Sequence, residues 1–223
     1  MRSWRVLGAA LAAGGCASHP TQPPGAPPTS TTITREEPGG DAHDPELAAL
    51  DRLLVEGWGM RQDRRMTVSV PLTDARTWRR VRYWTVETLT GFRFGDAHHG
   101  MAAIFLRDAP PDADADACMR IFEEWAGPIA RGLDVTIGAP VVTRTTHAGR
   151  ALAVRSRDAS LLWGTETRVF AGVYAAYAAW PGKCLVLGYA FPNEPRLQGR
   201  GAQVRDRYAR EAFGRLAPHQ PPP

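Results

Sequence analysis

The sequence predicts an α+β domain in which a central and a C-terminal helix pack on an antiparallel sheet, preceded by an N-terminal helix and a disordered linker. Segments with apolar residues at helical spacing lie near the ends and the middle of the chain. Strand-like segments joined by hairpin turns lie between them, and hairpins connect antiparallel strands. Of the 223 residues, those from 44 to 217 have the size of a single domain.

The first predicted helix lies in DPELAALDRLLVEGW, residues 44–58. Asp44 is suited to the N-cap and Pro45 to the first helical position. Four large apolar residues follow at helical spacing: Leu47, Leu50, Leu54 and Trp58. The segment is therefore expected to form an amphipathic helix.

Strands are predicted next in MTVSVPL, WRRVRYWTV and GFRFG, where β-branched and aromatic residues alternate with polar ones. GMAAIFLRD is continuously apolar, which predicts a strand buried on both faces. The central helix is predicted in DADACMRIFEEWAGPIARGL, and Pro128 is expected to kink or shorten it. Its apolar stripe consists of Cys118, Ile121, Phe122, Trp125 and Ile129.

Strand signals return in the second half of the chain. DVTIGAPVVTRTT and RALAVRS flank HAGR and predict a hairpin. TRVFAGVYAAYAAW and KCLVLGYAF flank Pro181 and Gly182, a pair typical of tight turns. A closing helix is predicted over residues 200–216, with Val204, Tyr208, Ala212 and Leu216 on one stripe.

This order of elements, with GYAFP running into a closing helix, resembles the PsbP-like fold. That fold is named for an extrinsic photosystem subunit and is shared by some bacterial lipoproteins. The resemblance covers the larger, C-terminal part of the chain and carries no catalytic motif. Cystatin-like and NTF2-like α+β folds are alternatives with similar element content.

At the N-terminus, Arg2 and Arg5 precede a short apolar run, and AGGC ends at Cys16. This segment resembles a type II signal peptide of bacterial lipoproteins. The resemblance implies cleavage after residue 15, attachment of diacylglycerol to the Cys16 thiol, and acylation of the new amino group by a fatty acid such as palmitate. Ala13 stands where that family prefers leucine, so an ordinary cleaved signal is the alternative.

The resemblance also implies a location in the bacterial cell envelope, with the domain held to the membrane through its lipid. Ala17 is not the aspartate that retains lipoproteins at the inner membrane, which favours the outer membrane if the cell has two.

Residues 16–43 are rich in Pro, Thr, Gly and Ser, which predicts an extended, disordered tether. A Pro-rich docking motif is the weaker interpretation, because no clean PxxP flanked by arginine is present. Residues 218–223 are likewise expected to be a disordered tail. The sequence thus divides into a signal peptide (1–15), a lipidated linker (16–43), the domain (44–217) and the tail.

The formal net charge is +4, and Lys183 is the only lysine. Arginines dispersed without a dense basic run argue against nucleic-acid binding. The partners we expect, besides the membrane, are an envelope protein, a glycan or a small ligand, and we expect no cofactor. Large aromatic residues near strands and turns either line a groove or belong to the core: Trp78, Trp84, Trp163 and Trp180.

Cys118 and Cys184 are the cysteines that remain once Cys16 is assigned. An exported chain with two such cysteines favours a disulfide, because its compartment is oxidising. Two buried, reduced thiols are the alternative.

Asp112, Asp114 and Asp116 alternate, and Glu123 follows at the spacing of an EF-hand loop. Ala117 occupies the position where that loop requires glycine, so we interpret the aspartates as N-terminal charges of the central helix.

GDAHHG offers Asp96, His98 and His99, with His147 elsewhere in the chain, as metal ligands. Adjacent histidines in a strand point to opposite faces, and a turn between Gly95 and Gly100 accounts for the same residues. No recognised catalytic motif is present. The sequence therefore favours a non-catalytic binding or assembly domain with no metal site. A metal-dependent hydrolase or other envelope enzyme is the alternative.

Overall fold

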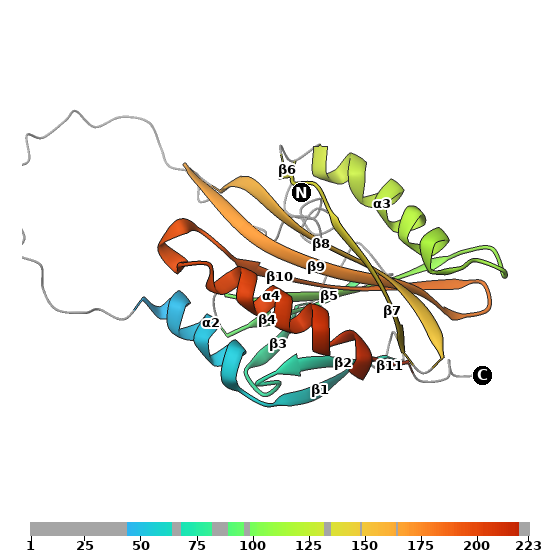
Figure 1. Ribbon diagram of the computed structural model, residues 1–223, viewed down its shortest axis with the longest axis horizontal. Helices are drawn as coiled ribbons and strands as arrows, with labels where there is room; N and C mark the ends of the chain where they lie inside the picture. Colours follow the sequence, from blue (N-terminus) through green and yellow to red (C-terminus); the bar gives the residue numbers. More distant parts are fainter. Residues whose placement is uncertain are drawn as a thin grey trace, which may run out of the picture.

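A computed structural model of the chain describes residues 44–218 apart from 64–67, 82–88, 96–98, 132–134, 148 and 164. The predicted α+β architecture is confirmed: helices pack on an antiparallel sheet, and one helix is C-terminal (Figure 1). The predicted signal peptide, linker and nearly all of the tail lie outside the described residues. No helix in the described part of the chain combines the length and apolar character needed to cross a bilayer.

The helices and 3₁₀ turns have the following bounds: α2 (Pro45–Val55), α3 (Ala115–Arg131), η1 (Pro195–Leu197), α4 (Arg200–Glu211) and η2 (Phe213–Arg215). The strands of the first half are β1 (Trp58–Asp63), β2 (Val68–Thr73), β3 (Trp78–Val81), β4 (Leu89–Phe94) and β5 (Met101–Asp108). Those of the second half are β6 (Thr136–Ile137), β7 (Val141–His147), β8 (Arg150–Trp163), β9 (Glu166–Trp180), β10 (Lys183–Pro192) and β11 (Ala217–Pro218).

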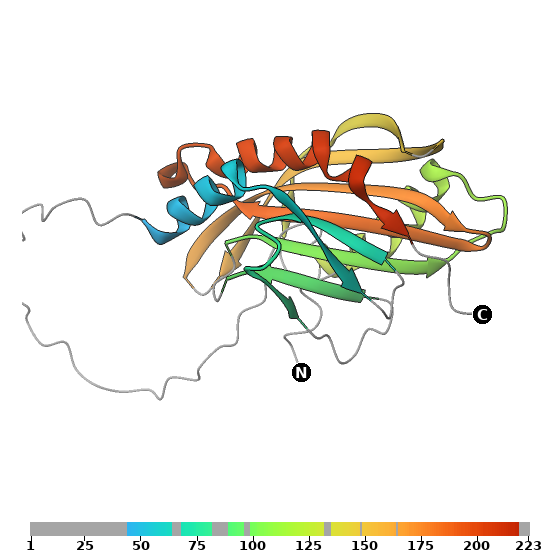
Figure 2. The same cartoon turned by 90° about the horizontal axis from the view of Figure 1, so that it is seen from below.

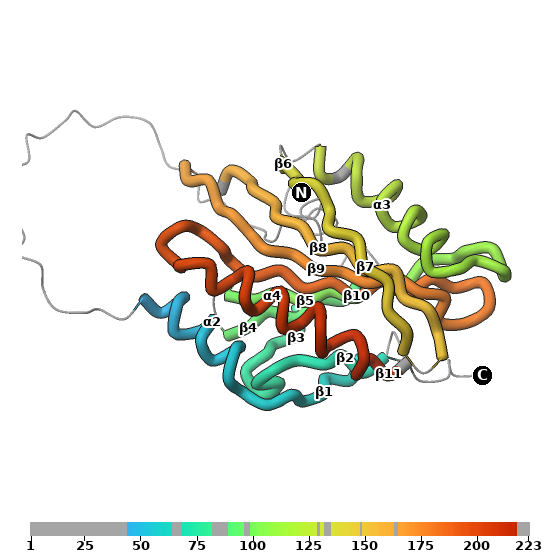
Figure 3. The backbone as a smooth tube through the Cα atoms, viewed as in Figure 1, coloured from blue at the N-terminus to red at the C-terminus, as the bar shows by residue number. Residues whose placement is uncertain are grey.

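The large sheet has the strand order β3-β4-β5-β10-β9-β8-β6, and β7 pairs with β8. All of its described pairings are antiparallel. Hairpin connections account for the pairs of consecutive strands, whereas β5–β10 and β6–β8 join strands that are not consecutive in the chain. β1, β2 and β11 form a second, smaller sheet. Figure 3 shows the chain passing from β6 through β7 into the long β8.

The two faces of the large sheet have separate hydrophobic cores. Helices α2 and α4 lie along one side of the sheet (Figure 2), where they share a core with the small sheet. Helix α3 covers the opposite face. Alternation along β10 supplies both cores: Leu185 and Leu187 face α4, while Cys184 and Val186 face α3.

Buried hydroxyl groups join the small sheet to the rest of the domain. The Tyr208 hydroxyl on α4 accepts the Thr73 backbone N–H at 2.9 Å. The Tyr189 hydroxyl on β10 donates to the Pro71 carbonyl at 2.8 Å. Burial raises the pKa of both tyrosines, which keeps both hydroxyls protonated well above neutral pH.

The C-terminal ends of three helices differ from the sequence prediction. α2 ends at Val55 because Glu56 is extended, and Trp58 then begins β1, which pairs with β2. α3 continues past Pro128 to Arg131, since its last turns still pack a buried Ala130 on the sheet. α4 ends at Glu211 and gives way to η2.

Candidate functional site

His99 is the member of the predicted GDAHHG site that the structure describes, since Asp96 and His98 lie outside the described residues. His99 Nδ1 lies 3.6 Å from Glu46 Oε1. His147 ends β7, four strand steps from β5, which is roughly 19 Å at the usual strand spacing. Among the described residues, no group of three or more His, Cys, Asp or Glu side chains is placed so that it could hold a metal ion. The structure thus brings His99 to a carboxylate and keeps His147 away from it.

Six titratable side chains meet where α2 begins, and we call them the Glu46 cluster: Asp44, Glu46, His99, Arg168, Glu194 and Arg196. Glu46 is at the centre and only 7% exposed. Its Oε1 is 2.7 Å from Arg168 Nη2, and its Oε2 pairs with Arg196. Arg168 also pairs with Glu194, and Arg196 with Asp44. The cluster joins α2 to β9 and η1.

The pKa of Glu46 is lowered from 4.5 to about 2. Burial, the largest single influence, raises this pKa, but hydrogen bonds and the positive charges of Arg168 and Arg196 together outweigh it. The His99 contact of 3.6 Å is longer than an ordinary hydrogen bond, so we attribute most of the lowering to the arginines. A carboxylate held in this state is a poor general base near neutral pH. The arrangement is that of a structural junction.

Glu46→Gln is expected to flatten the acid side of the stability profile. Because the folded pKa lies below the unfolded one, ionised Glu46 stabilises the fold above pH 4.5, and this stabilisation disappears as the pH falls toward 2. Allowing for solvent screening, we expect the glutamine variant to lose about 1–2 kcal/mol at pH 7 and almost nothing at pH 2. Urea unfolding across this range is the measurement. Asp112→Asn, which changes an exposed carboxylate, is the control. If the stability of Glu46→Gln followed that of the wild type at every pH, Glu46 would not stabilise the fold through its charge.

The acidic residues around α3 contact separate partners and do not converge on one site. Asp114 Oδ1 accepts the Ala117 N–H at 2.7 Å, which is an N-terminal cap of α3. Asp116 pairs with Arg144 at 2.6 Å, and Glu123 pairs with Arg157 at 2.7 Å. The interpretation of these aspartates as helix-terminal charges agrees with this geometry.

The predicted bridge between Cys118 and Cys184 is present, and it joins α3 to β10. Both residues are fully buried in the core under α3.

Of the aromatic residues for which groove and core were the alternatives, Trp78 belongs to the core, where it is buried and donates from Nε1 to the Thr73 carbonyl at 2.8 Å. Trp180 is half-buried beside the same core. Trp84 and the side chain of Trp163 lie outside the described part of the chain.

The most exposed regular element is β7, and we call Val141–His147 the β7 edge. Val141 is 65% and Val142 54% exposed, and residues 143–146 are exposed as well. Among the described strands β7 pairs with β8 alone, so its other edge has no strand partner, although η2 approaches β7. Such an edge presents backbone N–H and C=O groups to a second chain. Among the described residues, we take the β7 edge as the candidate binding surface.

The sequence predicted β7 as a strand but not as an edge, because strand order depends on pairings far apart in the chain. Glu46 carried no signal beyond its place in a first helical turn. Its partners Arg168 and Arg196 are more than a hundred residues away.

Comparison with known proteins gives matches at the level of structure. No family model and no curated protein matches the chain. The cyanobacterial PsbP protein (CyanoP) of Synechocystis sp. PCC 6803 superposes with a TM-score of 0.51 at 12% identity, covering 74% of this chain and 94% of that one. The Ran-binding protein Mog1p of Saccharomyces cerevisiae has a TM-score of 0.48 at 7% identity, over 73% and 96%. The likeness to CyanoP supports a PsbP-like fold for this chain.

Proposed function

We propose that this chain is a membrane-anchored envelope lipoprotein whose domain binds a partner and has no catalytic activity. The β7 edge carries the proposal, because it offers an open strand of seven residues to a partner. Two carboxylates that could serve in catalysis are instead engaged in contacts within the fold. Glu46 is paired with Arg168 and Arg196, and Glu123 contacts Arg157 and Tyr174. The PsbP-like fold is compatible with this function and specifies no ligand.

In this proposal Cys16 carries the anchor. A cysteine directly after an apolar run and small residues is the attachment point that the signal-peptide resemblance implies. Two or three acyl chains hold a protein durably, since each buried CH₂ contributes about 0.8 kcal/mol. The 28 residues from Cys16 to His43 would let the domain reach partners near the membrane surface.

Cys16→Ser is expected to release the protein from the membrane. The wild type should enter the detergent phase and incorporate a fatty-acid probe, and the serine variant should do neither. Ser18→Ala, two residues away, is the matched control and should behave as the wild type. A wild-type protein that is unlabelled and remains in the aqueous phase would exclude the anchor.

A further inference from the structure

The β7 edge has the composition of a strand that pairs. Five of its seven residues are valine or threonine, which favour extended structure. In an antiparallel pair, alternate residues direct both backbone groups away from the partner strand, so β7 presents about three outward-facing residues. Proteins usually protect such edges with lysine, proline or a bulge. β7 has no lysine, no proline and no bulge in its pairing with β8, and Arg144 is its one charged residue of the lysine and arginine type. These protections are therefore absent from β7.

β7 and the first half of β8 are rich in arginine, and Asp158 of β8 follows directly. Residues 141–157 contain four arginines and no aspartate or glutamate. Arg144 and Arg157 pair with Asp116 and Glu123 of α3. Arg150 and Arg155 donate to backbone carbonyls, and in the described part of the chain neither pairs with a carboxylate. An acidic partner would complement this surface.

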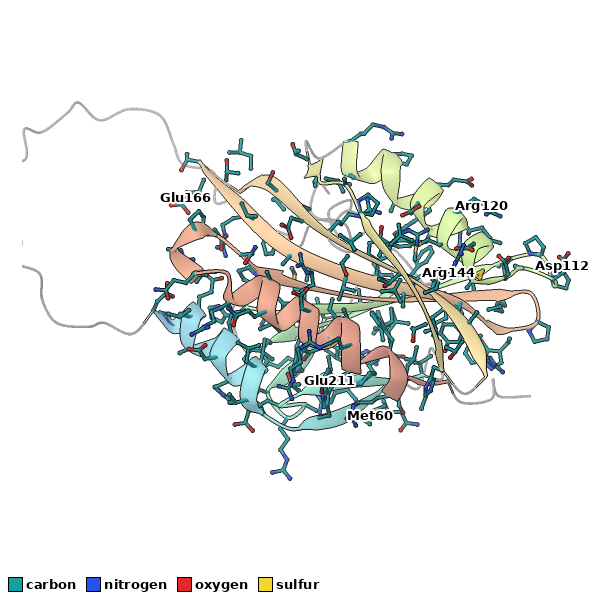
Figure 4. All side chains as sticks on the ribbon, in the orientation of Figure 1. Met60, Asp112, Arg120, Arg144, Glu166 and Glu211 are labelled. Atoms are coloured by element: carbon teal, nitrogen blue, oxygen red, sulfur yellow. A yellow bond between two sulfur atoms is a disulfide. The ribbon has the colours of Figure 1, made fainter. Side chains whose placement is uncertain are left out.

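The register places two of these arginines on one face. Arg144 lies opposite Ala153, which belongs to the core under α3, and Arg155 lies opposite Val142. Residues directly opposite share a face, so Arg144 and Arg155 are diagonal neighbours on the α3 side. Figure 4 shows Arg144 beside the first turns of α3. A strand added to β7 would turn every second side chain to this face, one strand away from Arg144 and two strands away from Arg155.

A second copy of the chain is not well suited to pair with the β7 edge. Two β7 strands paired antiparallel about their centre would place Arg144 opposite Arg144 of the other copy. Like charges directly opposite in a sheet are destabilising.

We propose that the β7 edge binds an extended acidic segment of a partner protein, which adds to the large sheet as a further strand. The inference rests on the proposed binding function. Main-chain hydrogen bonds to β7 supply the affinity, and acidic side chains at alternate positions, on the α3 side, give specificity for Arg144 and Arg155. The other face of the added strand lies beside Val141, which favours β-branched residues there.

The test is a titration of the full-length, disulfide-bonded protein with a fluorescent nonapeptide that alternates glutamate with threonine or valine. We expect saturable binding that weakens with salt. Arg144→Glu combined with Arg155→Glu should weaken binding about tenfold or more. Arg120→Glu combined with Arg210→Glu, on exposed parts of α3 and α4, changes the net charge equally and should leave affinity within about twofold. Thermal melts establish that each variant is folded.

Two further peptides distinguish strand addition from simple charge attraction. A peptide with lysine in place of glutamate should fail to bind because it lacks the negative charge. A backbone N-methylated peptide should also fail, because it lacks the N–H donors. If either peptide bound as tightly as the acidic peptide, or if the two double variants lost affinity equally, the inference would be overturned. The proposed binding function would then have to lie at another site. No binding of the acidic peptide, or a dimer joined through β7, would also overturn it. The anchor is tested separately through Cys16, so the two failures are distinguishable.

Discussion

Replacing Cys118 and Cys184 together by alanine is expected to lower the free energy of unfolding by about 4 kcal/mol. The disulfide closes a loop with a sequence separation of 66, and cross-linking a loop of this length removes much of the entropy of the unfolded chain. The bridge also joins α3 to β10, a strand inside the large sheet with neighbours on both sides. Its loss therefore allows α3 to separate from the sheet more readily.

Denaturant unfolding of the double variant measures this effect. The matched comparison is the wild type in reductant, which has the same sequence without the bridge and should lose a similar amount. Oxidised wild type and double variant with the same unfolding midpoint would show that the bridge contributes nothing to stability. A count of two free thiols in denaturant, before reduction, would show that it does not form.

Gly201→Ala is expected to destabilise the fold by about 3 kcal/mol or more. A Cβ atom at this position would lie 2.0 Å from the Pro192 carbonyl oxygen and 2.8 Å from its carbon. Both contacts are with backbone, so the start of α4 would have to move away from the end of β10. The same contact region places Asn193 Oδ1 on the Ala202 N–H at 3.1 Å. The gain in helix propensity from alanine is at most about 1 kcal/mol and cannot offset the clash.

Gly214→Ala is the matched control for this prediction. A Cβ there would meet no atom within 4 Å, and we expect a change within about 0.5 kcal/mol. Thermal and urea unfolding of the two variants, each compared with the wild type, give the difference. Equal stability of Gly201→Ala and the wild type would contradict the close packing of α4 on β10.

Much of the fold follows from local patterns in the sequence. Asp44 caps α2 as predicted, with its Oδ1 accepting the Glu46 N–H at 2.9 Å. The turn at Pro181 and Gly182 joins β9 to β10, and the hairpin after His147 joins β7 to β8. In these places capping, periodicity and turn chemistry all favour the same structure.

β1 could not be predicted in the same way. Trp58 continues the apolar spacing of the preceding helix, and WGMRQD has no clear strand pattern. The strand forms because β2 pairs with it along its whole length. Arg207 of α4 also bonds the carbonyls of Leu53 and Glu56, which supports the end of α2 from a distant part of the chain. Such tertiary contacts override local propensity.

The candidate binding site was predictable only in part. Its β-branched residues predict a strand, and its arginines are visible in the sequence. Its position at the edge depends on β8 lying between β7 and β9, which local spacing does not encode. The contacts that fix Arg144 and Arg157 come from α3, earlier in the chain.

Hydrogen exchange of the full-length protein with and without the acidic nonapeptide measures strand addition to β7 residue by residue. We expect outward-facing amides within Val141–His147 to exchange quickly in the free protein and slowly in the complex. The opposite edge strand β3, at Trp78–Val81, should be unchanged and serves as the internal comparison. Protection that falls on β3 or on a helix, with the amides of β7 unaffected, would show that the peptide does not add to β7.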